Sequence, residues 1–157
     1  MCYTVYGDEI MVTLREFCEK DVAALQTHQY PDLSDTEISQ MISDWNKRVY
    51  DSKYFEMFAV VNDNDVVGSV SLFQQSDDSV SYGVHIFEGF RRQGFAYEGL
   101  LLAMKIAKNK HYKFALANIR KSNAASIKLS EKLGFRYTGE HTTPRGILVN
   151  RYIKELT

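Results

Sequence analysis

Two kinds of apolar spacing follow one another along this chain. Residues 10–17 alternate between apolar and polar, which predicts a strand because successive side chains of a strand point to opposite faces. Apolar residues after position 21 have helical spacing and predict a first helix. A second helix is predicted to run to about Tyr50, with Ser34 or Asp35 as its N-terminal cap.

The second predicted helix carries one apolar stripe. Ile38, Ile42 and Trp45 recur on one side of it, as is typical of a helix packed on a core. We expect this stripe to be buried. Tyr30, Trp45 and Tyr50 are also candidates to line a substrate cleft.

The rest of the chain predicts a hairpin followed by alternating strands and helices. A polar turn at residues 62–65 separates two apolar segments, 58–61 and 66–73, which is a hairpin pattern. The expected elements after it are a strand at Val80–Phe87, a helix at Ala96–Lys110, a strand at Lys113–Ile119, a helix at Asn123–Leu133, and strands at Phe135–His141 and Ile147–Leu156. This order places seven strands and four helices along the chain.

Composition narrows the class of protein. With 157 residues, 45% of them hydrophobic, the chain is long enough for a core of its own, and we expect one domain over residues 1–157. We find neither an apolar stretch of membrane-spanning length nor a basic and apolar leader. We therefore expect a cytoplasmic protein with no membrane partner.

Charge is divided unevenly between the two halves of the sequence. Residues 1–90 contain 5 basic and 16 acidic residues, whereas residues 91–157 contain 14 and 4, within a formal net charge of -1. This division could bring a cationic and an anionic ligand to one cleft, or it could reflect solvated surfaces. Nucleic acid is not an expected partner, because the basic residues are scattered. The histidines and cysteines lack ligand spacing, so we expect no metal.

The segment between the strand at 80–87 and the helix at 96–110 carries the clearest chemistry. It reads Arg91-Arg92-Gln93-Gly94-Phe95-Ala96. Small residues let the backbone close on a ligand, and the N–H groups and dipole of the following helix favour negative charge. Arginine adds forked donors that suit phosphate oxygens. The segment therefore predicts a phosphate site, although such a turn can also be a plain connection.

A second motif lies downstream, where Asn123 and Ser126 are followed by Leu-Gly-Phe at residues 133–135. Together, the Arg-x-x-Gly-x-Ala turn and this motif resemble the GCN5-related N-acetyltransferases, most closely the branch that acetylates ribosomal-protein N termini. The resemblance covers nearly the whole chain and is strongest from about residue 80 to residue 135. It implies an α/β fold with a mixed, mostly antiparallel sheet of six to seven strands and about four helices. Splayed central strands would form the acetyl-CoA cleft.

The same resemblance implies an acyltransferase that moves an acetyl group from acetyl-CoA to a primary amine within a ternary complex. The acceptor would be a protein N terminus or a small amine, and the chain is a candidate homodimer. A non-catalytic acyl-CoA-binding module is the alternative. The implied cofactor-binding residues are Val84, His85 and Ile86 through their backbone, Arg91, Arg92, Gln93, Gly94, Phe95 and Ala96 at the pyrophosphate, and Asn123 with Ser126.

Four residues are candidates for proton transfer. Many members of the family carry a tyrosine acid where this chain has Ser130, so that role does not carry over directly. Ser126 or Ser130 could protonate the leaving thiolate, directly or through water. His85, with a reference pKa near 6.5, and Glu98 are candidates for the base. Glu98 is also favourable in a first helical turn for structural reasons alone, and Asn123 is also a good helix cap.

Overall fold

Nine strands and four α-helices make up the part of the chain that the computed structural model describes, residues 3–6 and 11–157. The strands are β1 (Tyr3–Tyr6), β2 (Met11–Glu16), β3 (Val49–Tyr50), β4 (Lys53–Asn62), β5 (Asp65–Ser76), β6 (Ser79–Ile86), β7 (Phe114–Ile119), β8 (Arg136–Thr142) and β9 (Leu148–Glu155). The helices are α1 (Val22–His28), α2 (Asp35–Trp45), α3 (Phe95–Asn109) and α4 (Ala124–Lys132), with 3-10 turns at Glu19–Asp21 and Glu88–Phe90.

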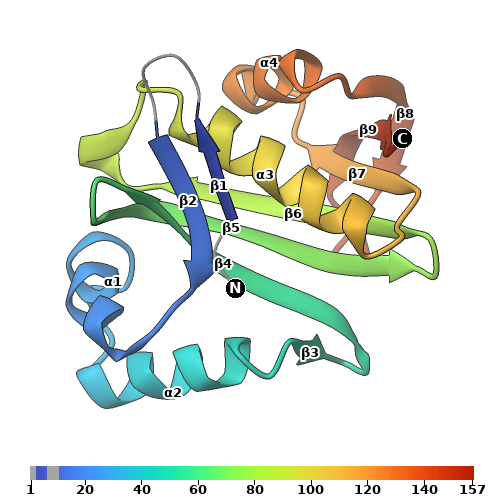
Figure 1. The fold of residues 1–157 in the computed structure, drawn as a ribbon. Coiled ribbons are helices and arrows are strands. Elements are labelled where there is room, and N and C mark those ends of the chain that lie inside the picture. Colours follow the sequence, from blue (N-terminus) through green and yellow to red (C-terminus); the bar gives the residue numbers. More distant parts are fainter. Residues whose placement is uncertain (1–2, 7–10) are drawn as a thin grey trace.

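The strands form one sheet in the order β1-β2-β4-β5-β6-β7-β9-β8, and β3 pairs with β4 off this path (Figure 1). Every neighbouring pair is antiparallel except β6 and β7, which are parallel. The predicted fold class, a mixed and mostly antiparallel sheet with four helices, is confirmed. The sheet is wider than the six to seven strands expected, because β1 and β3 were not predicted. Ile10, at the start of the first predicted strand, lies outside the described residues.

The second predicted helix begins as expected and ends earlier. Ser34 caps α2: its Oγ accepts a hydrogen bond from the Glu37 N–H, and the Glu37 carboxylate accepts one from the Ser34 N–H, both at 3.2 Å. The prediction that this helix reaches Tyr50 is wrong. Arg48 has a φ of 59°, which a right-handed helix does not allow, and the next two residues pair with β4 as strand β3.

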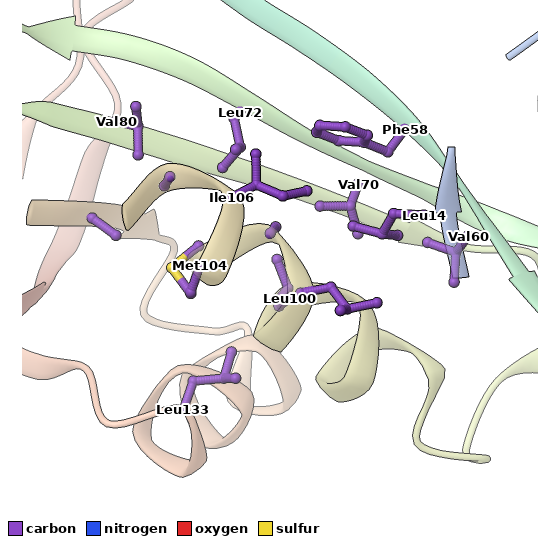
Figure 2. Packing of buried hydrophobic residues seen from close by; sticks show 14 of the residues in the cluster. Leu14, Phe58, Val60, Val70, Leu72, Val80, Leu100, Met104, Ile106 and Leu133 are labelled. Atoms are coloured by element: carbon purple, nitrogen blue, oxygen red, sulfur yellow. The ribbon is translucent and has the colours of Figure 1, made fainter. Parts of the chain in front are cut away.

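The larger core lies between the sheet and α3. Leu100, Met104 and Ile106 of the helix are buried against apolar side chains that point down from the strands, Leu72 among them (Figure 2). In Figure 1, α3 is the yellow helix that crosses the face of the sheet. Burial of this stripe anchors the start of α3, so the turn that precedes the helix is held against a rigid layer.

A second core covers the opposite face. Leu25 of α1 and Ile38 and Ile42 of α2 pack with Ala59 of β4 and with Phe87, directly after β6. The α2 stripe predicted to be buried is therefore confirmed as core at its two isoleucines. Among the described residues, no helix has the length and apolar character needed to cross a membrane.

Candidate active site

Strands β6 and β7 separate after three residue pairs. Residues 79–81 lie opposite residues 114–116, whereas β6 continues to Ile86 and β7 to Ile119. A pocket of about 290 Å³ occupies the opening, and α4 closes one side of it. Tyr82, Gly83 and Val84 line it from β6, residues 117–120 from β7 and its end, and Asn123, Ser126 and Leu129 from the next helix. The predicted splay of the central strands is therefore observed.

A second pocket, of about 340 Å³, lies at the turn between β6 and α3. Gly94 has a φ of 85° and precedes the first residue of α3, while Arg92 has a φ of 63°. Two left-handed residues so close together bend the chain sharply around the helix N terminus, a conformation that glycine adopts without strain. Val84, Ser126 and Leu129 line both pockets. The two pockets are thus parts of one cleft on the α3 and α4 side of the sheet.

The turn end of this cleft is positively charged. Arg91, Arg92 and Lys132 line it, and none of the described residues that line it carries a carboxylate. The Arg91 Nε–H donates a hydrogen bond of 3.0 Å to the Ile86 carbonyl, which fixes the guanidinium beside the end of β6. The Lys132 ammonium lies 4.1 Å from the centre of the Tyr97 ring. Together with the N terminus of α3, these cations suit a phosphate-bearing ligand.

Most of the residues predicted to bind the cofactor line this cleft. They are Val84, Ile86, Arg91, Arg92, Gly94, Phe95, Ala96, Asn123 and Ser126. Gln93 is exposed and lies outside both linings, as does the side chain of His85. Asn123 is also the cap of α4, because its Oδ1 accepts a 3.1 Å hydrogen bond from the Ser126 N–H. The structure shows Asn123 as a helix cap, whereas contact between Asn123 and a cofactor stays a prediction.

His85 faces the other side of the sheet. Alternation along β6 turns it, with Gly83, toward the side covered by α1 and α2. Its ring lies 6.0 Å from that of Phe87, which in turn stacks on His28 at 4.8 Å. Burial, and secondarily the charge of Arg91, lower the pKa of His85 below its usual value of 6.5. The imidazole is therefore neutral at pH 7 and able to accept a proton.

The three remaining candidates for proton transfer, Ser126, Ser130 and Glu98, differ in their access to the cleft. Ser130 is fully buried, and its Oγ lies 2.8 Å from the Tyr82 hydroxyl. Glu98 lies in the first turn of α3, outside the residues that line either pocket. Of the two predicted serines, only Ser126 lines the cleft directly.

Tyr82 was not predicted from the sequence. It is the first residue of β6 beyond the pairing with β7, and it lines the opening between the two strands. Its ring packs edge-on against Phe135 at 5.5 Å, and burial raises the pKa of its phenol. The sequence did offer one indication of its role. Members of the family carry a tyrosine at the position of Ser130, and the hydroxyl of Tyr82 lies next to the Ser130 side chain although it comes from the strand.

Within residues 3–6 and 11–157, no three His, Cys, Asp or Glu side chains gather where they could hold a metal ion. The polar groups that line the cleft are backbone groups, arginines, Lys132, the amides of Asn118 and Asn123, and hydroxyl groups.

Two comparisons of sequence bear on the chain. Residues 11–136 match the family described as acetyltransferase (GNAT) domain. An uncharacterized N-acetyltransferase, YokL, derived from the SPbeta prophage of Bacillus subtilis strain 168, is 29% identical over 100 residues. That alignment covers 62% of this chain and 56% of YokL, so it spans little more than half of the relative.

Solved structures of low sequence identity share the fold. RimJ of Mycobacterium smegmatis, in complex with CoA-disulfide, has a TM-score of 0.81 at 15% identity, covering 98% of this chain and 86% of RimJ. RimL, described as a ribosomal L7/L12 alpha-N-protein acetyltransferase in complex with coenzyme A, has a TM-score of 0.80 at 17% identity, covering 98% of both chains.

Proposed function

The chain belongs to the GNAT acetyltransferase family, and from this premise we propose that it is an acyltransferase that transfers an acetyl group from acetyl-CoA to a primary amine. The observation that carries the proposal is the continuous cleft. It runs from a cationic turn at the start of α3 to the opening between β6 and β7. A ligand with a phosphate-bearing end and a long narrow arm fits that combination of charge and shape.

We propose positions in the cleft for two parts of coenzyme A. The pyrophosphate would lie on the backbone N–H groups at the start of α3, next to Arg91 and Arg92. The pantetheine arm would follow β6 past Val84, with Ser126 on the opposite wall. Backbone groups of β6 beyond Ser81 no longer pair with β7, so they are free on that side to bind the arm.

Bound acetyl-CoA supplies the activated thioester, and the residues around it move two protons. His85 lies on the same face of β6 as Gly83, and its neutral imidazole would accept the proton that the amine loses. Tyr82 points to the cofactor side and would donate a proton to the departing sulfur. No covalent enzyme intermediate is needed, because the amine attacks the thioester directly.

Tyr82 is a better acid for this step than either serine. The reference pKa of a phenol, about 10, is far closer to that of a thiol, about 8.5, than the pKa of a serine hydroxyl is. Burial raises the pKa of Tyr82, so the phenol stays protonated at neutral pH. Ser130, at 2.8 Å, would hold the phenol in place and so act as a positioning residue.

The acceptor that we propose is the N terminus of a protein or peptide, and the second candidate is a small amine. RimL, which shares the fold over the full length, is described as acting on a protein α-amine, and this favours a peptide. The acidic first half of the chain would attract either cationic acceptor. A thiol-release assay with acetyl-CoA across peptides and small amines tests the proposal. If acetyl-CoA binds tightly but none of the amines in the panel causes thiol release, the result would instead indicate a non-catalytic binding module.

Binding of the cofactor should raise the thermal stability of the protein, because acetyl-CoA binds the folded turn and not the unfolded chain. At 100 times its Kd it should add about 2.7 kcal/mol, which corresponds to a rise in Tm of roughly 5–10 °C for a chain of this size. Differential scanning fluorimetry measures the shift, with NAD as the matched nucleotide control. A shift with NAD and none with coenzyme A would contradict the proposed cofactor.

Replacement of Tyr82 by Phe should lower kcat about tenfold or more and leave the Kd of acetyl-CoA within about twofold. The ring and its packing on Phe135 remain, so only the hydroxyl is lost. Ser130→Ala, which removes the hydroxyl's partner, should have a smaller effect on kcat. Stopped-flow or steady-state thiol release gives the rates, and a Tyr82→Phe enzyme with normal kcat would rule out the phenol as the acid.

A further inference from the structure

A large groove lies on the other face of the sheet. It has a volume of about 1060 Å³ and runs between α2 and the neighbouring ends of β3, β4 and β5. We call it the aromatic groove, and it is defined by Met41 and Trp45 of α2, Tyr50 of β3, Phe55 of β4 and Phe73 of β5. Its volume is at the upper end of the range found for small-molecule sites, so a large side chain could enter it without rearrangement of the fold.

Three rings form the floor of the aromatic groove. The ring centres of Tyr50, Phe55 and Phe73 lie 5.9 to 6.4 Å apart, each pair tilted or edge-on. Tyr50 is nonetheless 66% exposed, and its neighbour Val49 is 58% exposed. An apolar surface that is hollowed, aromatic and open to solvent is typical of a site that binds an apolar group.

A row of paired residues leads from the aromatic groove to Ser81, which directly precedes Tyr82 on the cofactor strand. Phe55 lies opposite Phe73, and Phe73 lies opposite Ser81 of β6. Paired residues of antiparallel strands share a face, so this row lies on the same side of the sheet as Gly83 and His85. Neighbouring strands are about 4.8 Å apart, which puts Phe55 roughly 10 Å from the cofactor strand. An extended peptide covers that distance in about three residues.

The charges on the rim favour a cationic occupant. The lining includes three carboxylates and one ammonium group, those of Glu37, Asp44, Asp51 and Lys47. The Lys47 ammonium forms a 2.9 Å ion pair with Asp44. Glu37 and Asp51 therefore leave the rim with a negative field, which suits an apolar side chain flanked by an amine or a lysine.

We propose that the aromatic groove binds an apolar side chain of the acceptor peptide, about three residues from the amine that is acetylated. This inference rests on the proposed transfer to a peptide N terminus. It makes the groove the specificity site for acceptors with a large apolar residue near position three and a basic residue after it. Acceptors that are polar throughout their first residues would bind without using it.

Trp45 gives a direct readout of this site. It is the only tryptophan of the chain and lines the aromatic groove, so its fluorescence reports occupancy whether or not acetyl transfer takes place. The experiment titrates the whole protein, saturated with coenzyme A, with two peptides, Ala-Gly-Phe-Gly-Lys and Ala-Gly-Ser-Gly-Lys. The peptide with Phe should change the emission of Trp45 and bind at least about tenfold more tightly. The same ratio should be found in kcat/KM.

Three variants test whether the preference comes from the groove. Tyr50→Ala should reduce the ratio between the two peptides to about threefold or less, whereas Tyr50→Phe should retain it because the ring remains. Tyr137→Ala is the matched control: this tyrosine is also on a strand and 55% exposed, but it lies on β8 and outside the lining of the groove. It should keep the full ratio.

The outcomes separate the groove from the proposed activity. A preference in Trp45 fluorescence without acetylation of any peptide would support the groove and contradict the proposed function. Acetylation of both peptides at equal kcat/KM would overturn the groove and leave the function standing. If Tyr50→Ala instead converts a dimer to a monomer in sedimentation velocity, with the peptide ratio unchanged, a second copy of the chain occupies the groove and the inference fails.

Discussion

The Gly94→Val protein should bind acetyl-CoA at least about 100-fold more weakly than the wild type and still fold. Two effects combine. The φ of 85° is strained for any residue with a Cβ, and most of all for a β-branched one. The added methyl groups also occupy the space in front of the first N–H groups of α3, where phosphate oxygens would approach. Isothermal titration calorimetry with acetyl-CoA measures the loss.

Gly146→Val separates these two effects. Gly146 has a φ of 79°, and a Cβ added to it would meet no heavy atom within 4 Å, but it lies between β8 and β9. The substitution therefore carries a similar backbone strain at a distance from the turn, and the Kd of acetyl-CoA should stay within about twofold. If Gly94→Val bound acetyl-CoA normally, the turn would have no role in binding and would only connect β6 to α3.

The second large effect is expected at His85, where replacement by Gln should lower kcat by a factor of about 10² to 10⁴. Gln keeps a polar side chain of similar reach and cannot take up a proton. Because burial and Arg91 lower the pKa of His85, the rise of kcat/KM with pH should lie below pH 6.5 in the wild type. That rise should disappear in the variant, and the affinity for acetyl-CoA should hardly change.

Glu98→Gln is the comparison for this measurement. Glu98 was predicted as an alternative base, and its carboxylate lies outside the linings of the cleft. We expect a smaller loss in kcat than for His85→Gln. A loss confined to Glu98→Gln would transfer the role of base to that residue. If neither variant loses even tenfold, ordered water and backbone carbonyls deprotonate the amine, and the pH profile follows the acceptor.

Local signals in the sequence were sufficient for most of the fold. The capping residues around Ser34, the α2 stripe and the turn at Gly94 each depend on a few neighbouring residues, and all three were found in the structure. Strand β3 could not be predicted in this way. It consists of two residues, and it exists because the helix ends at Trp45, the chain turns at Arg48 and the next two residues pair with β4.

The site could be predicted only where its chemistry is contiguous in sequence. The turn at residues 91–96 forms one wall by itself, and all of its residues except Gln93 line the cleft. Their contact with a cofactor stays a prediction. The pair of Tyr82 and Ser130 joins residues 48 positions apart, and a pattern of spacing cannot show it. Alternation along a strand does predict the face of the sheet to which each side chain points. It places His85 and Val84 on opposite faces.

The cofactor cleft and the aromatic groove are built from different stretches of the sequence, and this has a consequence for how the two sites can evolve. The proposed cofactor cleft uses residues 82–132, whereas α2 and the β3 to β5 ends that form the aromatic groove lie within residues 33–73. Changes in one stretch of sequence can therefore accumulate with little effect on the other. If the proposed acceptor role is right, exchange of residues 33–73 between relatives would change the acceptor preference and leave the residues of the cofactor cleft as they are.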